Sequence, residues 1–157
     1  MLAELGATTF RETYGAANEL GNMESYLASS FSTDTLAKEL TDPKSAYLLA
    51  QVREQSLGYA KLRAGEVPEC VTLQPSIELE RIYVLQQAKG KGIGSALMQA
   101  CLDTAAQNGY RAVWLGVWQR NQAAIGFYQK WHFKKTGEKI FMLGADAQCD
   151  WVMLRQL

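Results

Sequence analysis

The sequence predicts one mixed α/β (α+β) domain that spans residues 1–157. Three observations support this prediction. The length suits a single hydrophobic core. Hydrophobic residues make up 48% of the chain and charged residues 20%, which is typical of a globular domain. Apolar runs with the period of a strand also alternate along the chain with apolar residues spaced three and four apart, as in a helix.

The first third of the chain predicts helices followed by a hairpin. Residues 1–42 carry helical apolar spacing that is interrupted at Gly15 and Gly21. The apolar runs 45–52 and 57–62 flank a short polar turn, so they predict two antiparallel strands.

The rest of the chain predicts a crossover and a final pair of strands. The strand 77–84 leads into a glycine-rich turn and an amphipathic helix. A strand at 111–118 follows, and then a helix that Asn121 caps. The last strands are expected at 133–143 and 150–157. This order implies one parallel crossover.

Composition and charge exclude several classes of protein. Sixteen basic and sixteen acidic side chains cancel, which argues against a surface built for nucleic acid. No apolar run is long enough for a membrane helix, and the first residues lack the basic start of a signal peptide, so no membrane partner is expected. One histidine and three scattered cysteines predict neither a metal site nor a disulfide framework, and they favour a cytoplasmic location.

Charge is nevertheless divided along the chain. Residues 1–80 hold twelve acidic and six basic side chains, so this half carries −6 and the remainder +6. Such a division indicates either two differently charged ligands or chance.

The glycine-rich turn is the most informative segment. Residues 89–95 join a strand to a helix, so free backbone N–H groups and the positive end of the helix dipole meet there, and Lys89 and Lys91 add charge. This pattern indicates a phosphate-binding loop or, alternatively, a plain turn that leads into a helix. The P-loop pattern is absent, and Ser95 stands where a dinucleotide-binding turn needs glycine.

Two motifs together resemble the GNAT acyl-CoA N-acetyltransferase family. The pyrophosphate motif of the family matches Lys-Gly-Lys-Gly-Ile-Gly at 89–94. Its second signature matches Asn121, Ala124, Phe127, Tyr128, Lys130 and Phe133. The resemblance extends to the branch that acetylates spermine and spermidine, the PaiA type. It implies the GNAT fold, a mixed and mostly antiparallel sheet whose middle strands splay apart between flanking helices. This chain begins in a helix, so the first strand of the family is either missing or truncated.

The resemblance also implies acetyl-CoA as the cosubstrate, without a metal. The strand before the turn would bind pantetheine, the turn would bind the pyrophosphate, and the second motif would add contacts. The cofactor-binding residues that it implies are Ile82, Tyr83, Val84, Lys89, Gly90, Lys91, Gly92, Ile93, Gly94, Ser95, Asn121, Phe127 and Lys130.

Three catalytic residues follow from the same resemblance. Tyr128 is expected to protonate the CoA thiolate, because a tyrosine with a pKa of about 10 keeps its proton at neutral pH. Glu80 matches the base of polyamine acetyltransferases and Glu78 is the alternative, and either can act through water or simply bind the acceptor. His132 stands where the family has glycine, and we interpret it as a left-handed helix terminator rather than a base.

The expected reaction is direct transfer of an acetyl group from acetyl-CoA to a primary amine. Glu66, Glu69, Glu78 and Glu80 favour a small cationic acceptor, a polyamine such as spermidine or spermine, although the first two can equally be solvated. Four aromatic residues are candidates either for an acceptor channel or for the core: Tyr26, Phe31, Trp114 and Trp118. The alternatives are a protein lysine, a protein N-terminus or another small amine as acceptor, and a non-catalytic CoA sensor. Relatives often form homodimers, so a second copy is a further candidate partner.

Overall fold

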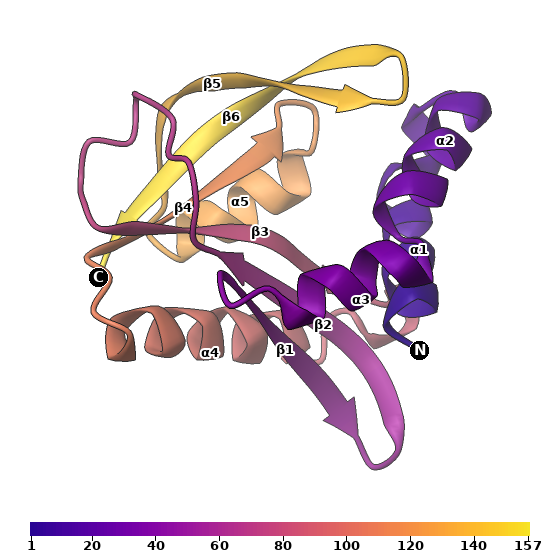
Figure 1. Cartoon of the computed structure of the whole chain (residues 1–157), viewed down its shortest axis with the longest axis horizontal. Coiled ribbons are helices and arrows are strands. Elements are labelled where there is room, and N and C mark those ends of the chain that lie inside the picture. Colours follow the sequence, from indigo (N-terminus) through magenta and orange to yellow (C-terminus); the bar gives the residue numbers. More distant parts are fainter.

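The computed structural model describes all 157 residues and consists of one six-stranded sheet with helices packed against it (Figure 1). The helices are α1 (Leu2–Tyr14), α2 (Leu20–Ser30), α3 (Thr33–Thr41), α4 (Ile93–Gln107) and α5 (Gln122–Lys130), with short 3-10 turns at Gly15–Ala17 and Gln86–Ala88. The strands are β1 (Ser45–Val52), β2 (Gln55–Arg63), β3 (Ser76–Val84), β4 (Ala112–Trp118), β5 (Lys134–Leu143) and β6 (Asp146–Gln156). None of the helices combines the length and the apolar character that crossing a membrane requires.

The sheet has the order β1-β2-β3-β4-β6-β5. Only β3 and β4 are parallel neighbours, and α4 connects them; every other pair is antiparallel. The predicted α+β fold with a single parallel crossover is therefore confirmed. The first element of the sheet-and-helix order is α1.

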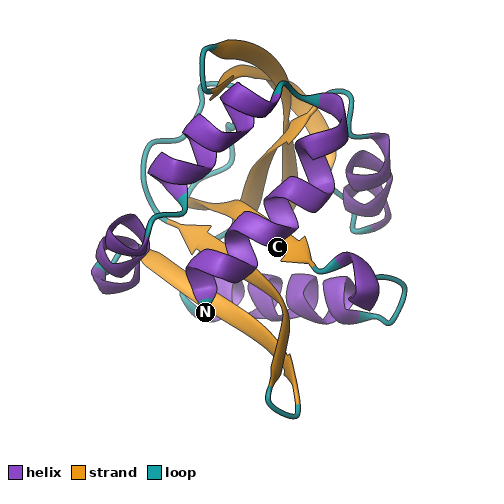
Figure 2. Cartoon of the chain, turned by 90° about the vertical axis from the view of Figure 1, so that its right-hand side faces the viewer, coloured by secondary structure: helices purple, strands orange, loops and turns teal.

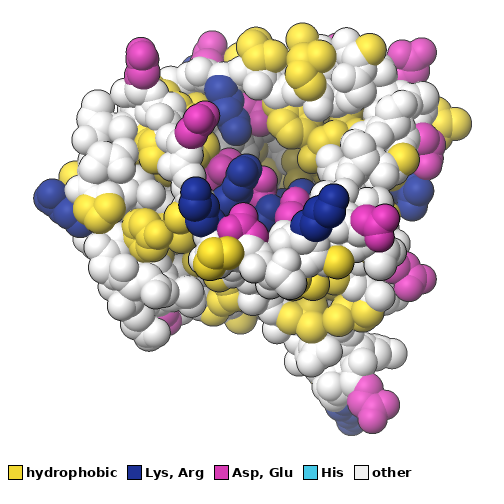
Figure 3. All heavy atoms as spheres, viewed as in Figure 1, with side chains coloured by type: hydrophobic (Ala, Val, Ile, Leu, Met, Phe, Trp, Pro, Cys, Tyr) yellow, Lys and Arg dark blue, Asp and Glu magenta, His cyan; other side chains and the backbone are white.

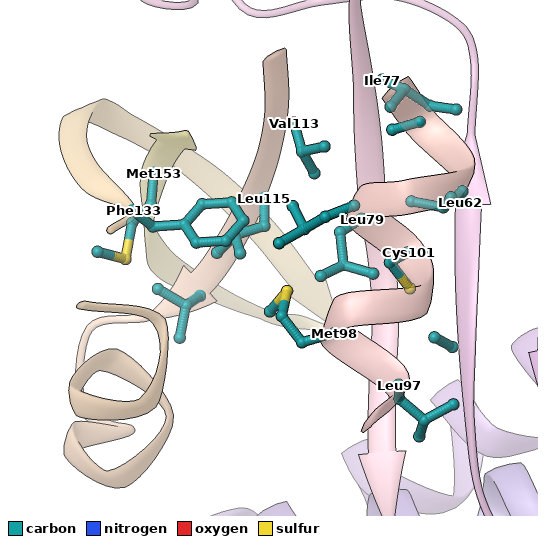
Figure 4. Close-up of a cluster of buried hydrophobic side chains, with 14 of the residues drawn as sticks. Leu62, Ile77, Leu79, Leu97, Met98, Cys101, Val113, Leu115, Phe133 and Met153 are labelled. Carbon is teal, nitrogen blue, oxygen red and sulfur yellow. The ribbon is translucent and has the colours of Figure 1, made fainter. Parts of the chain in front are cut away.

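Helices cover both faces of the sheet. On one face, α4 presents Leu97, Met98 and Cys101 to buried residues of the central strands, as Figure 4 shows. The one-turn spacing of these side chains places them on one stripe of the helix. On the other face, α1 and α2 form a second cluster that includes Tyr59 of β2 and Leu143 of β5. Figure 2 shows α1 lying across the sheet on this side.

Two predicted boundaries were wrong. Gly21 does not interrupt a helix, because α2 begins at Leu20 and a glycine in the first turn costs little; the break lies at the 3-10 turn after α1. The last strand begins at Asp146 rather than at residue 150, since Gly144 adopts a φ of 59° and closes a tight hairpin with β5.

The histidine behaves as predicted. His132 has a φ of 65°, and the N–H of Phe133 donates to the carbonyl of Tyr128 at 3.1 Å, which is the hydrogen bond of a left-handed helix end. His132 is exposed and lies outside both pockets described below. Its interpretation as the terminator of α5 is confirmed.

Candidate functional site

The two central strands separate along their length. Strands β3 and β4 pair only where Ser76–Glu78 faces Ala112–Trp114. Beyond this point β3 stays paired with β2 as far as Val84, so the β4-facing edge of residues 79–84 has no strand partner. The gap offers a row of backbone N–H and C=O groups to an extended ligand.

Two pockets meet at this gap. The larger has a volume of about 480 Å³, and we call it the glycine-loop pocket. The smaller has a volume of about 250 Å³, and we call it the aromatic pocket. The glycine-loop pocket is lined by Thr13, Tyr14, residues 79–84, 88–90 and 92–95, Gly116, Val117, Asn121, Ala123, Ala124, Phe127 and Tyr128. The aromatic pocket is lined by Phe10, Tyr14, Tyr26, Phe31, Arg63, Glu78, Glu80, Arg81, Tyr83, Trp114, Gly116, Trp118, Lys139, Phe141, Leu143, Gln148 and Asp150.

The glycine-rich turn presents free backbone N–H groups to the glycine-loop pocket. Gly90 and Gly92 have φ values of 76° and 80°, which only glycine adopts without strain. The first hydrogen bond into α4 runs from the N–H of Ala96 to the carbonyl of Gly92, so the amides of residues 90–95 donate to no backbone carbonyl. Together with the helix dipole, free amides of this kind can hold an anion.

Most of the predicted cofactor-binding residues line the glycine-loop pocket. The exceptions are Lys91 and Lys130, which are both exposed. Lys130 lies in the last turn of α5, whereas the pocket contacts the earlier turns of that helix. Asn121 lines the pocket and also caps α5, because its Oδ1 accepts a hydrogen bond from the N–H of Ala124 at 3.2 Å.

Tyr128 lines the glycine-loop pocket with its ring held by aromatic neighbours. Its ring centroid lies 5.6 Å from that of Phe127 and 5.9 Å from that of Phe133. Burial raises the pKa of the Tyr128 hydroxyl above its ordinary value, so the group is protonated at neutral pH. Before any transfer takes place, it is therefore a proton donor rather than a base.

Five residues line both pockets: Tyr14, Glu80, Arg81, Tyr83 and Gly116. The hydroxyls of Tyr14 and Tyr83 lie 3.5 Å apart at this junction. Sequence reasoning missed Tyr14, because α1 carries no motif and only the packing of α1 against β3 brings this side chain to the site.

A β-bulge at Glu80 directs several charged side chains into the aromatic pocket. Lys61 of β2 faces Arg81, and the next residue, Leu62, faces Leu79, so Glu80 is the unpaired extra residue. Strand alternation alone would turn Glu80 and Arg81 to opposite faces. With the bulge, Glu78, Glu80 and Arg81 all line the same pocket.

The aromatic pocket contains side chains of both signs, and Figure 3 shows them gathered around a hollow on this face. Glu80 contacts the buried Lys61 and lies 3.6 Å from Arg63. Glu78 lies 3.8 Å from Nζ of Lys139. Burial raises the pKa of Glu78, while Lys139 opposes the increase.

A buried ionic network lies beneath this pocket and joins α3 to the sheet. Lys61 is only 1% exposed, and its Nζ lies 3.0 Å from Glu39 of α3. Arg81 donates to the same carboxylate at 2.9 Å, and the hydroxyl of Tyr47 donates to it as well. Burial alone would raise the pKa of Glu39, but the hydrogen bond from Tyr47 and the charge of Arg81 hold it below its ordinary value.

The other candidate residues from the sequence either line the aromatic pocket or are exposed to solvent. The four candidate aromatic residues Tyr26, Phe31, Trp114 and Trp118 all line the aromatic pocket. Trp114 is also buried against Val71 and Val152, so it serves both the wall and the core. Glu66 and Glu69 are exposed in the loop after β2 and line neither pocket.

Asp150 is a pocket residue that sequence reasoning missed. It lies on β6, where residues 148, 150 and 152 are buried in alternation. Burial raises the pKa of Asp150 to about 6, although Lys139 opposes the increase. The sequence signal that points to it is an acidic residue at an inward-facing position of a strand. Because the predicted strand starts only at residue 150, it leaves out the buried position 148 that would reveal the alternation.

Comparison with known proteins shows which family the chain belongs to. Residues 9–133 match the acetyltransferase (GNAT) family. An uncharacterized N-acetyltransferase of Mycobacterium tuberculosis is 38% identical over 156 residues, which cover 99% of this chain and 96% of that protein.

Two solved structures share the fold. The PaiA N-acetyltransferase of Thermoplasma acidophilum, in complex with coenzyme A, is 21% identical with a TM-score of 0.76, covering 99% of this chain and 91% of that one. A GCN5-related N-acetyltransferase of Rhodopseudomonas palustris is 15% identical with a TM-score of 0.79, covering 99% and 88%. The family match spans the splayed strands, the glycine-rich turn and the second motif. The chain therefore belongs to the acetyltransferase (GNAT) family and is an acetyl-CoA-dependent N-acetyltransferase.

Proposed function

We propose that the protein acetylates a primary amine that binds in the aromatic pocket while acetyl-CoA occupies the glycine-loop pocket. The observation that carries this proposal is that the two pockets share Tyr14, Glu80, Arg81, Tyr83 and Gly116. Molecules bound in adjoining pockets are held close enough for direct transfer, which removes much of the entropic barrier to their reaction.

The glycine-loop pocket supplies the contacts that acetyl-CoA needs. The free amides of residues 90–95 bind the pyrophosphate, and the unpaired edge of β3 binds pantetheine. The backbone N–H of Ile82 or Tyr83 polarises the thioester oxygen. A donor of this kind is typically worth about 3–4 kcal/mol in the transition state.

Two side-chain roles complete the mechanism. Tyr128 protonates the departing thiolate, because its buried hydroxyl keeps its proton at neutral pH. Glu78 and Glu80, which the sequence singles out as candidate bases or acceptor ligands, lie in the aromatic pocket beside cations. Their ion pairs favour the role of holding the ammonium group of the acceptor.

We propose a polyamine as the acceptor. Three carboxylates line the aromatic pocket, those of Glu78, Glu80 and Asp150, and aromatic rings form much of the remaining wall. Carboxylates bind ammonium groups, and aromatic faces bind both cations and the methylene chains between them.

A second acceptor class is favoured by the cations in the same pocket. Lys139 and Arg63 also line it. An amine that carries a carboxylate, such as an amino acid or the end of a peptide, would pair with them and would leave the pocket carboxylates for its ammonium group.

The test measures CoA thiol release from acetyl-CoA with spermidine, spermine, single amino acids, a lysine-rich peptide and no acceptor. We expect the highest kcat/KM with a polyamine. The Lys139→Met variant should raise the polyamine value, because a like charge leaves the pocket. The matched control is Lys135→Met, an exposed lysine of the same strand outside the pocket.

Other outcomes give different answers. Turnover with amino acids that falls in Lys139→Met would support the second class and reject the polyamine. Turnover with the lysine-rich peptide alone would reject both classes, because it requires an acceptor surface other than the aromatic pocket.

A further inference from the structure

Asp150 is the one carboxylate of the aromatic pocket that no cation binds. Glu78 and Glu80 both form ion pairs. The Asp150 side chain forms no ion pair and no hydrogen bond with another residue, and only the charge of Lys139 acts on it, although the residue is only 7% exposed. Burial of a carboxylate without a hydrogen-bonding or ion-pair partner costs free energy, and such groups are concentrated at functional sites.

The position of Asp150 brings it to the junction of the two pockets. A Cβ atom on Gly116 would lie 3.2 Å from Oδ2 of Asp150 and 2.6 Å from Cε of Lys139. The absence of a side chain at Gly116 therefore leaves room for both side chains over β4. Because Gly116 lines both pockets, the carboxylate lies where an amine in one pocket would meet a thioester in the other.

The charged and titratable groups that line the pocket around Asp150 come from five elements. Lys139 faces Asp150 from β5, and Arg63 lines the pocket from β2. The others are Glu78, Glu80, Arg81 and Tyr83 of β3, Tyr14 of α1 and Tyr26 of α2. Burial raises the pKa of Asp150 to about 6, and Lys139 limits the increase. The carboxylate is thus ionised at neutral pH yet accepts a proton near it, which is the range in which a general base is most effective.

We propose that Asp150 is the general base of the acetyl transfer and that Glu78 and Glu80 orient the acceptor. This inference rests on the proposed function. The Asp150 carboxylate removes one proton from the ammonium group of the acceptor, and the neutral nitrogen attacks the thioester carbon. A C–N bond forms and the C–S bond breaks.

The protons balance in this scheme. The thiolate takes a proton from Tyr128, and the second proton lost by the nitrogen restores the Tyr128 hydroxyl. The proton on Asp150 passes to solvent through the aromatic pocket. The sum is an ammonium ion and acetyl-CoA giving an amide, CoA thiol and one proton.

The first test compares the pH profiles of kcat and kcat/KM for the wild type and Asp150→Asn. In the wild type, kcat/KM should fall as the pH drops through about 6. The variant should lose at least ~100-fold in kcat with little change in KM, because general base catalysis typically contributes 10²–10⁴-fold. It should also lose the acidic limb. Glu138→Gln, an exposed acid on β5 outside the pocket, is the control and should keep the wild-type profile.

The second test uses an aminooxy analogue of the best acceptor, whose nitrogen is in the neutral –NH2 form rather than the ammonium form at neutral pH. Such a nucleophile needs no base for its first proton, so Asp150→Asn should lose far less activity with it than with the amine. A purely structural role of Asp150 predicts equal losses with both acceptors. Unchanged CoA binding by the variant, measured by calorimetry, establishes that it is folded.

Different results would contradict the two proposals. If the wild type acetylates no amine, the proposed function is wrong, and so is the proposed role of Asp150. If the wild type is active and Asp150→Asn keeps its kcat and its acidic limb, or loses equally with both acceptors, the assignment of Asp150 is overturned while the function stands.

Discussion

Burial gives two polar side chains of this protein opposite chemical capacities. Tyr128 and Asp150 both lie on pocket walls, and burial raises the pKa of each. For the tyrosine this keeps the hydroxyl protonated at neutral pH. For the aspartate it moves proton uptake from strongly acidic pH to near neutrality. The same cause thus leaves a protonated hydroxyl in the glycine-loop pocket and a carboxylate that takes up a proton near neutrality in the aromatic pocket.

Replacement of Tyr128 by phenylalanine removes the proposed acid with almost no change in volume. We expect kcat to fall by about 10²-fold, the lower end of what a general acid contributes, while CoA affinity stays within about threefold. Stopped-flow or steady-state thiol release measures this. A variant with full kcat would assign protonation of the thiolate to another group, and Tyr14 and Tyr83, which line both pockets, are the next candidates.

Asp150 also makes stability depend on pH. Its pKa is about 6 in the folded protein and about 3.9 in an unfolded chain, so the folded state binds more protons between these values. The free energy of unfolding should therefore fall as pH rises from about 4 to about 6, by on the order of 1–3 kcal/mol from this group. Asp150→Asn should remove this decrease and be more stable than the wild type at pH 7. Urea unfolding of both proteins at about pH 4 and at pH 7 tests this prediction. It is contradicted if their free energies of unfolding differ by the same amount at both pH values.

At the scale of elements, the glycine-rich turn depends on backbone conformation. Gly92 has a φ of 80° and nothing within 4 Å of the place where a Cβ would lie. Replacement of Gly92 by alanine should therefore lower the free energy of unfolding by about 1–2 kcal/mol, solely because alanine disfavours this φ. The same change should tilt the backbone amides of the turn.

Gly92→Ala should consequently lower both the free energy of unfolding and the affinity for CoA. The control is Gly126→Ala, inside α5 and equally free of contacts, which should raise stability by about 0.5–1 kcal/mol because alanine favours helices. Urea unfolding and calorimetry measure the two quantities. CoA affinity that is unchanged in Gly92→Ala would argue against the turn as the pyrophosphate site.

Lys61 connects α3 to the sheet through Glu39. Replacement of Lys61 by methionine removes the buried cation that pairs with both Glu39 and Glu80. We expect the free energy of unfolding to fall by about 3 kcal/mol. Lys135→Met, at an exposed pair, should leave the free energy of unfolding unchanged within error. Chemical denaturation compares the two. Equal, small effects would show that Arg81 alone compensates Glu39.

For the molecule as a whole, acetyl-CoA should stabilise the fold, because a ligand that bridges the gap between β3 and β4, as we propose, binds the folded state alone. At a concentration of about 100 times Kd, a ligand adds about 2.7 kcal/mol, which raises Tm by roughly 5–10 °C for a domain of this size. Thermal unfolding with and without acetyl-CoA measures the shift. A Tm that does not change would contradict binding in the glycine-loop pocket.

Local patterns were sufficient for much of this protein. The hairpin of β1 and β2, the strand β3, the glycine-rich turn and the cap of Asn121 each depend on residues close together in the sequence. The same holds for His132 at the end of α5. Such features are set by turn chemistry, capping and periodicity, which act over a few residues.

The sequence alone was enough to predict the fold class, the glycine-rich turn and the resemblance to a family of acetyl-CoA enzymes, because these follow from short-range conformational preferences and contiguous motifs. Which residues meet in space depends on the tertiary structure. Tyr14 of α1 and Asp150 of β6 reach one junction across most of the chain, and the bulge at Glu80 turns two successive residues into one pocket. Those placements depend on strand register, bulges and helix packing, which arise from contacts between distant segments that no local pattern records.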